Sequence, residues 1–370
     1  MAKNRLVLTD IPLDDPLSRY FDFKNIEYDR LPTEHDVPLV DIIDHRSKGK
    51  ADVILILGLV KNGRSNGNSS MEQLFRQVSV YNDFRRLRQR VTLIVYAESD
   101  ILVRLNSMRK INFEYYSWFR DLKPLILTDG VVGQNLRNDY NDCEFVELSM
   151  PHLHPNLIYP ELGIVKNHKP TTDYLCLMAD WPDRPFRHLL NEKILANGIH
   201  DNMIYSFKKK NRETFDDLRN HFNESVLDNL GWMDGFPSID LYNQTNLELA
   251  PETLCEDHDD TFFMTEKTIK PIAMKHPFMV LANKNFLKNL RGLGFKTFHE
   301  HLDESYDSEP MIEKRVDILM KNLIQHKNQT HKIYKDTKQI RDHNHLNLQH
   351  QAGEYWTKLF KTIDDILRNI

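Results

Sequence analysis

Asp52-Val53-Ile54-Leu55-Ile56-Leu57-Gly58 is the stretch that decides the fold of this 370-residue chain. A continuous apolar run that ends in glycine is typical of a strand buried on both faces of a parallel sheet. A polar loop over 61–68 follows, and a capping box beginning at Ser69 or Ser70 then opens a segment with apolar residues at helical spacing as far as Leu87. This order of strand, loop and helix predicts the first unit of a doubly wound α/β domain.

The same alternation continues along the chain. Short strands are expected near the start at 5–8 and 37–40, and the rest of the first half predicts strands 91–96, 124–128 and 144–149 with a helix at 113–122. A second series predicts strands 174–179, 203–207, 247–250, 278–282 and 295–298, and helices 184–197, 212–230, 286–293 and from about 308 onward. Two α/β domains with parallel sheets are therefore expected, with ligands in the crevice at the carboxyl ends of their strands.

Length and composition agree with a two-domain globular protein. A chain of 370 residues exceeds the usual size of one core, and 40% hydrophobic with 28% charged residues is ordinary. The segment 151–172 has three prolines in its first ten positions and little periodicity, so the linker is placed there. The expected division is a first domain over 1–165, a second over 170–325 and C-terminal helices over 326–370 that pack back on the first domain.

Several protein classes are disfavoured by the same data. The longest apolar run, 53–60, is too short for a membrane helix, and no apolar segment of a secretory signal follows Met1. Three cysteines lie far apart (Cys143, Cys176 and Cys255), which favours a reducing cytoplasm and no thiol-based zinc site. A net charge of −5 does not indicate nucleic-acid binding by the molecule as a whole.

The most informative stretch is Thr265-Glu266-Lys267-Thr268-Ile269-Lys270-Pro271-Ile272, followed by Leu290-Arg291-Gly292-Leu293-Gly294-Phe295-Lys296-Thr297-Phe298. It resembles a group of phage and bacterial glycosyltransferases that carry a TEKT-x-KP-[IL] helix start and an L-R-x-L-G-F-K-T-F close. It is also distantly similar to the donor motif of α1,3-fucosyltransferases, in which T-E-K opens the corresponding helix. The resemblance covers about 170–310 and implies a GT-B fold, with a nucleotide-sugar such as a UDP-sugar bound by the second domain and the acceptor by the first.

The residues of this motif suit a diphosphate ligand. Thr265 can cap a helix whose free N–H groups and dipole attract phosphate. Glu266 can accept the two ribose hydroxyls, and Lys267 can place its ammonium against the β-phosphate and offset the charge of the departing nucleotide. Pro271 predicts a kink in the helix or the start of its regular part. The plain alternative is that Thr265 and Glu266 only begin a helix.

Other donor contacts are implied by the resemblance. Related enzymes follow the corresponding strand with an R-x-x-R-like segment, which here assigns Arg184 or Arg187 to the diphosphate. Ser206 matches a position that touches the nucleotide, and Glu252 matches a glutamate that reaches the donor in fucosyltransferases. Each of these side chains is also an ordinary solvated residue at a helix start or loop, so both interpretations stay open.

No cofactor and no essential metal are expected. Asp257, Asp259 and Asp260 look like a metal-binding acidic motif, but GT-B enzymes release the nucleotide with basic residues and a helix dipole, so a solvated loop is predicted. A helical, polar segment contains His343, His345 and His350, and these histidines are predicted to be exposed on the helix rather than to bind a metal.

The acceptor side requires a general base if the transfer inverts the sugar configuration. Glu98, directly after the predicted strand 91–96, resembles a glutamate-serine step of fucosyltransferases near their catalytic base. Asp100 is a second candidate and Asp129 a third, and His152 and His154 near the linker are further ones. A retaining mechanism needs no such base, and the sequence does not distinguish the two outcomes.

Three functions compete at this point. The favoured acceptor is a hydroxylated or hydroxymethylated cytosine in double-stranded phage DNA, which basic clusters at 85–90, 104–110 and 208–212 can contact through phosphates. A surface polysaccharide or its precursor is the second acceptor, by analogy with fucosyltransferases. A non-catalytic module that binds nucleotides or nucleic acid is the alternative from another class, and the intact Glu266 and Lys267 argue against it.

Overall fold

A computed structural model provides the coordinates of the chain. The structure describes residues 5–9, 28–30, 52–59, 91–98, 125–141, 143–148, 168–180, 184–209 and 239–369. The predicted strand 37–40, the predicted helices 71–87, 113–122 and 212–230, and most of the predicted linker lie outside these ranges. The chain divides into two compact units, Met1–Ser149 with Tyr355–Ile370, and Met150–Glu354.

The first unit contains a parallel sheet with the order β2-β1-β3-β4-β5-β6 among the described strands. The strands are β1 (Arg5–Thr9), β2 (Tyr28–Arg30), β3 (Asp52–Leu59), β4 (Val91–Glu98), β5 (Leu125–Asp129) and β6 (Glu144–Glu147). A short helix, α7 (Gln134–Asp139), joins the last two. The apolar run that opened the sequence analysis is thus a central strand with a neighbour on each side, as its pattern predicts.

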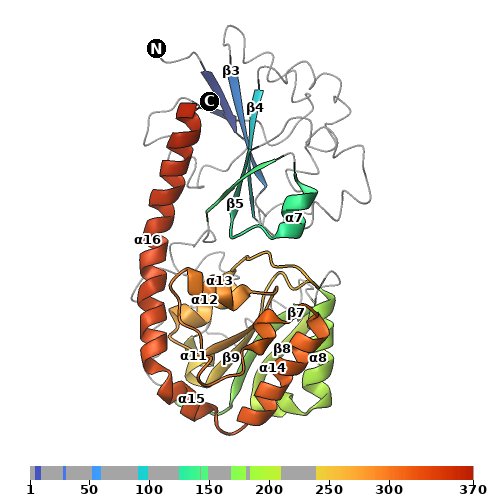
Figure 1. Cartoon of the computed structure of the whole chain (residues 1–370). Helices are drawn as coiled ribbons and strands as arrows, with labels where there is room; N and C mark the ends of the chain where they lie inside the picture. Colours follow the sequence, from blue (N-terminus) through green and yellow to red (C-terminus); the bar gives the residue numbers. More distant parts are fainter. Residues whose placement is uncertain are drawn as a thin grey trace. The chain divides into compact units, whose positions relative to one another are not determined.

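The second unit contains a parallel sheet with the order β10-β9-β7-β8 (Figure 1). The strands are β7 (Tyr174–Asp180), β8 (Met203–Lys209), β9 (Leu247–Pro251) and β10 (Phe278–Leu281). From β7 the chain moves outward to β8 and then returns to the other side of β7 to form β9. The strand order therefore reverses between β7 and β9, which is the place where open α/β sheets bind ligands.

Helices of the second unit cover both faces of this sheet. The helices of this unit are α8 (Pro185–Ala196), α11 (Ile239–Asn243), α12 (Glu266–Ala273), α13 (Phe286–Gly292), α14 (Ile312–His326) and α15 (Thr330–Asp336), together with the part of α16 (Lys338–Asn369) that precedes Tyr355. The Tyr174 hydroxyl donates to the Leu323 carbonyl of α14 at 2.6 Å, whereas its neighbour Leu175 packs with Tyr242 of α11 and Met274 beyond α12. Because successive strand residues point to opposite faces, α14 and the pair α11 and α12 lie on opposite sides of the sheet.

The predicted strand at 295–298 is wrong, because this segment is an irregular turn held by side chains. The Asn344 amide of α16 accepts from the Lys296 N–H at 2.7 Å and donates to the Lys296 carbonyl at 2.8 Å. Gly294 has φ +82°, and a Cβ there would lie 3.3 Å from the Asn347 side chain, so glycine suits this turn on both counts. Side chains of α16 thus replace the neighbouring strand that the apolar pattern predicts.

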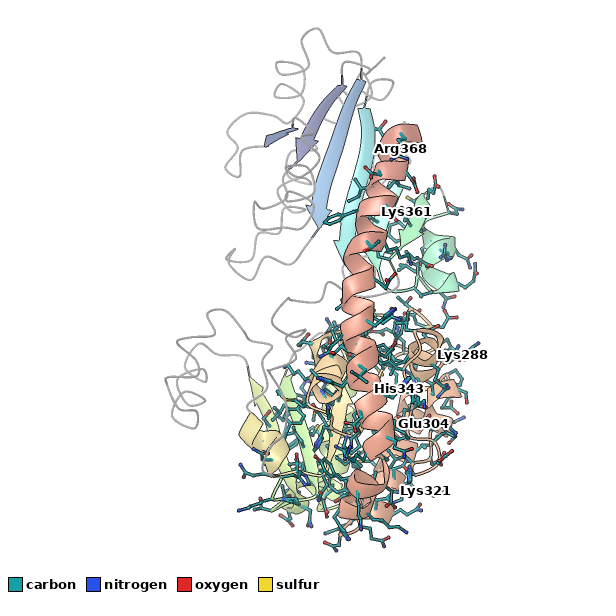
Figure 2. All side chains as sticks on the ribbon, turned by 90° about the vertical axis from the view of Figure 1, so that its left-hand side faces the viewer. Lys288, Glu304, Lys321, His343, Lys361 and Arg368 are labelled. Carbon is teal, nitrogen blue, oxygen red and sulfur yellow. The ribbon has the colours of Figure 1, made fainter. Side chains whose placement is uncertain are left out.

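Of the three histidines of α16, His350 is exposed as predicted, His343 is half-buried and His345 differs from the prediction. Figure 2 marks His343 on this helix, and its Nε2 lies 2.8 Å from the Gly294 carbonyl oxygen. His345 is buried rather than exposed, and its Nδ1 lies 3.0 Å from the Ala273 carbonyl oxygen at the end of α12. Both therefore serve packing within the second unit. No helix among the described residues is long and apolar enough to cross a membrane.

Candidate functional site

Helix α12 begins at the carboxyl end of the second sheet with the predicted cap. Thr265 is extended, with φ −113° and ψ −177°, and its Oγ1 accepts a hydrogen bond from the Lys267 N–H. Glu266 is the first helical residue, which places a carboxylate at the positive end of the helix dipole. Pro271 lies inside the helix, so the Lys267 carbonyl four residues earlier lacks its helical partner.

A second acid, Glu252, fastens the loop after β9 to this helix start. Its Oε1 accepts from the Thr265 N–H at 3.1 Å and the Thr268 hydroxyl at 2.6 Å. Its Oε2 accepts from the Thr253 N–H at 3.1 Å and the Thr265 hydroxyl at 2.5 Å. The carboxylate is fully buried with four protein donors, so its role in the structure is to hold the loop and the helix together. The predicted contact between Glu252 and the donor stays a prediction.

The loop after β9 and the start of α12 form a corner, and Lys267 lies on its exposed side. Its Nζ is 2.7 Å from Glu266 Oε1, 3.2 Å from Thr253 Oγ1 and 3.3 Å from Thr265 Oγ1. The side chain of Lys267 is 21% exposed and that of Glu266 is 39% exposed. The two groups expected to contact a nucleotide are therefore accessible, and they form an ion pair with each other.

Both candidate arginines reach the corner from the loop after β7. Arg184 immediately precedes α8, and its Nη1 donates to the Thr253 carbonyl. Arg187 lies in the first turn of α8, and its Nη2 donates to the Glu252 carbonyl at 3.2 Å. The residues after β7 and after β9 thus meet where the strand order reverses, and they bring two guanidinium groups beside the start of α12.

Charges shape the protonation of the acids at this corner. Burial alone would raise the pKa of Glu266, but the positive charges of Lys267 and Lys270 lower it to about 2. Glu248 lies on β9, four residues before Glu252. Burial raises its pKa to about 7, against the opposing effects of the Tyr242 hydroxyl and Lys270. Burial lowers the pKa of Lys270. Glu266 is consequently an anion at neutral pH, whereas Glu248 is near its midpoint.

The structure does not join every predicted residue to this corner. Ser206 lies within the edge strand β8, and its hydroxyl donates to the Met178 carbonyl at 3.4 Å. Glu98 is the last residue of β4, and its backbone is in register with Asp129, the last residue of β5. These two candidate bases thus end neighbouring strands of the first sheet. Asp100 lies outside the described residues.

The acidic run is a loop with Asp257 exposed and Asp259 and Asp260 half-exposed, as predicted, and two of its aspartates also hold neighbouring backbone and side-chain groups. Asp257 Oδ1 accepts from the Ile312 N–H at the start of α14 at 2.6 Å. Asp259 accepts from the Thr261 N–H and hydroxyl and from the Asn283 amide, at 3.1, 2.9 and 2.9 Å. Within the described ranges, no three His, Cys, Asp or Glu side chains form a group suited to a metal ion.

Four residues that shape the corner were not predicted as parts of it, namely Thr253, Thr268, Lys270 and Glu248. Thr268 and Lys270 lie inside the quoted motif, one helical turn after Thr265 and Glu266, and this spacing was the available signal. Glu248 interrupts the apolar pattern of β9 at a buried position, which is itself unusual for a glutamate.

Comparisons with known proteins bear on the fold. No family model and no curated protein sequence matches the chain. Among solved structures, a trehalose-6-phosphate synthase studied with bisubstrate glycomimetics is 9% identical with a TM-score of 0.50, over 99% of each chain. The Burkholderia multivorans trehalose 6-phosphate synthase is 10% identical with a TM-score of 0.43, over 90% of this chain and 74% of its own.

A chain of the GtfA/B complex is 14% identical with a TM-score of 0.35, and the present chain covers 60% of its length. The full-length match to the first synthase is the one that carries weight, because its TM-score reaches 0.50 over nearly the whole of both chains. Together with the two parallel α/β sheets in separate units, it shows that this chain has the GT-B fold.

Proposed function

We propose that this chain is a glycosyltransferase that uses a nucleotide-sugar, with the donor diphosphate bound at the start of α12. The observation that carries the proposal is the position of Lys267, accessible at a capped helix start where the strand order of a GT-B sheet reverses. Arg184 and Arg187 add positive charge at the same corner. Helix dipole and basic side chains are the elements that stabilise a departing nucleoside diphosphate.

Each donor residue has a distinct proposed role. Lys267 contacts the phosphate next to the sugar and stabilises the charge that develops as the glycosidic bond breaks. Glu266 accepts hydrogen bonds from the ribose hydroxyls, and Thr265 caps the helix start, whose dipole favours the diphosphate. Arg184 and Arg187 are proposed to hold the diphosphate, and Ser206 is a further proposed donor contact. Glu252 is proposed to act on the donor through the loop and helix start that its buried carboxylate holds. The donor is proposed to be a UDP-sugar, and no cofactor or metal is required by these roles.

Substitution of Lys267 tests the donor site. Lys267→Ala is expected to weaken UDP binding about 10- to 100-fold, because hydrogen bonds to charged groups contribute about 1.5–3 kcal/mol. Isothermal titration of wild type and variant with UDP measures the change, and hydrolysis of several UDP-sugars reports the activity. Lys321→Ala removes an exposed lysine of α14 and is the matched control. Equal UDP affinity in the wild type and Lys267→Ala would contradict the site assignment.

The proposed acceptor is a hydroxylated or hydroxymethylated cytosine in double-stranded DNA, with a glycan as the alternative. It is supported by the basic clusters of the sequence, whose side chains lie outside the described parts of the structure. A stacked base cannot reach the donor, so it must turn out of the duplex. For an inverting transfer, Glu98 is the proposed base, and its position at the carboxyl end of β4 supports it.

Mass spectrometry of reactions that offer UDP-sugars to hydroxymethylated duplexes and to glycans tests the acceptor. DNA binding should fall steeply with salt if phosphates are contacted. Glu98→Gln is expected to lower turnover by about 10²–10⁴-fold without changing UDP affinity. Transfer of the sugar to glycans but not to DNA would show that the acceptor is a glycan. Full activity of Glu98→Gln would show that Glu98 is not the general base.

A further inference from the structure

The Lys267 ammonium already has a full set of acceptors within the protein. An ammonium carries three N–H donors. The carboxylate of Glu266 and the hydroxyls of Thr253 and Thr265 lie at 2.7, 3.2 and 3.3 Å from Nζ. A phosphate oxygen that binds Lys267 must therefore replace one of these acceptors. The Thr265 hydroxyl is tied into the helix cap by Glu252, and the backbone of Thr253 is held by Glu252 and Arg184. Glu266 is the half-exposed side chain of the three, so it is the group that gives way.

We infer that Glu266 is a specificity-determining residue, which competes with phosphate oxygens for Lys267 and so favours nucleoside diphosphates over inorganic pyrophosphate. The inference rests on the proposed function, since it concerns the same donor site. A displaced carboxylate next to a bound anion is unfavourable unless it gains a new partner. A ribose supplies two hydroxyl donors for that purpose, whereas inorganic pyrophosphate has no sugar and leaves Glu266 facing like charge.

Charge and exposure both support this role. Lys267 and Lys270 keep the pKa of Glu266 at about 2 despite the opposing effect of burial, so the carboxylate is charged whenever a phosphate approaches at neutral pH. The Glu266 side chain is 39% exposed at the first position of α12, which gives it room to turn away from Lys267. Glu252, in contrast, is fully buried with four donors and is fixed in place.

Two titrations test the inference. Wild type and Glu266→Gln are titrated calorimetrically with UDP and with inorganic pyrophosphate at one ionic strength. Pyrophosphate affinity is expected to rise about two- to fivefold in the variant, because a half-buried ion pair that competed for Lys267 is removed. UDP affinity is expected to fall about 10- to 100-fold, because a charged acceptor of the ribose is lost. Opposite signs for the two ligands are the signature, since a disturbed helix start would weaken both.

Matched variants complete the test. Asp317 of α14 is an exposed carboxylate that pairs with Lys193 of α8 at 2.7 Å. Asp317→Asn changes the net charge by the same amount as Glu266→Gln, and it should leave the affinities for UDP and pyrophosphate unchanged. Glu266→Ala should show the same two signs as Glu266→Gln. In a Lys267→Met background, Glu266→Gln should no longer raise pyrophosphate affinity, because there is no ammonium to release.

The outcomes separate the inference from the function on which it rests. If the wild type binds UDP and Glu266→Gln weakens UDP and pyrophosphate alike, the inference is overturned and the proposed donor site stands. A pyrophosphate gain that persists in the Lys267→Met background also overturns it. Failure of the wild type to bind UDP overturns the proposed function, and the inference with it.

Discussion

Single residues in the second unit carry charge at places where burial makes it expensive. Glu248 of β9 is 5% exposed, and its Oε2 accepts from the Tyr242 hydroxyl at 2.7 Å. Burial raises its pKa to about 7, and Lys270 and the tyrosine hydroxyl oppose that rise. Since the ordinary pKa of a glutamate is 4.5, the folded protein binds more protons than the unfolded chain between about pH 4.5 and 7. The stability of the folded state through this group therefore falls as pH rises across that window.

Replacement of Glu248 by a neutral isostere tests this dependence. Glu248→Gln keeps an acceptor for Tyr242 but cannot ionise, so it is expected to be more stable than the wild type at pH 8 by about 1–3 kcal/mol. The difference should shrink toward pH 5, where the wild-type carboxyl is protonated. Urea unfolding of both proteins at pH 5 and pH 8 measures it. A stability difference that does not change with pH would contradict the argument.

At the scale of the element, α12 depends on clamps at both of its ends. A helix of eight residues with an internal proline is marginal on its own. Glu252 holds its first turn through Thr265 and Thr268. At the other end, Arg341 of α16 donates to the Lys275 carbonyl at 2.5 Å, and His345 contacts the Ala273 carbonyl. Tertiary contacts rather than intrinsic propensity thus set the position of the proposed donor site.

Substitution of Thr268 tests whether Glu252 holds the helix start, without changing a residue that is proposed to contact the donor. Its side chain is fully buried, and its hydroxyl donates to Glu252 Oε1. Thr268→Val should lower the free energy of unfolding by about 1–3 kcal/mol, because it leaves a buried carboxylate oxygen with one donor fewer. UDP affinity should fall as well, since the helix start loosens. Thr268→Ser keeps the hydroxyl and is the matched control, expected to resemble the wild type in unfolding and in titration. Equal stability of the Val and Ser variants would count against the clamp.

The sequence predicts the elements well because their signals are local. Buried strands such as Asp52–Leu59 and Leu247–Pro251 are apolar runs, and the cap at Thr265 is recognisable from residue type and context. The site residues Arg184 and Glu252 were found from the family resemblance. The structure brings Arg184 to the Thr253 carbonyl and Arg187 to the Glu252 carbonyl in the loop after β9, across 69 and 65 residues of chain.

What the sequence does not predict depends on partners distant along the chain. The apolar residues at 295–298 suggest a strand, but Asn344, 48 positions later, takes both backbone groups of Lys296. The donors around Glu252 likewise follow from the packing of α12. The sequence alone therefore does not distinguish a buried glutamate that holds the helix from an exposed one that contacts a ligand. His345 is buried because it binds the end of α12, which its polar surroundings in the sequence do not indicate.

At the scale of the whole molecule, the described donor residues belong to one unit. Arg184, Arg187, Glu252 and residues 265–267 all lie in Met150–Glu354, whereas Glu98 lies in the other unit. The side chains of α16 that grip the second unit, from Arg341 to Gln351, also fall within these bounds. The contacts described above that shape the proposed donor site therefore all lie within the second unit.

A fragment of residues 150–354 is accordingly expected to fold alone and to bind UDP within about tenfold of the full chain, because domains with their own core fold independently. Circular dichroism, thermal unfolding and UDP titration measure this. A fragment that ends at 337 lacks the Asn344 and Arg341 contacts and should not unfold cooperatively. A folded 150–354 fragment without UDP affinity would place essential donor contacts in the first unit.

The carboxylate of Glu252 has a consequence for the order of assembly during folding. Its four donors lie only 1 to 16 positions along the chain, so the entropy lost in closing that loop is small. The two arginines arrive from 65 to 69 positions away, after β7 and β9 have paired. Contacts of short sequence separation form earlier in folding. We therefore expect the contacts of Glu252 to form before those of the two arginines, which require the pairing of β7 with β9.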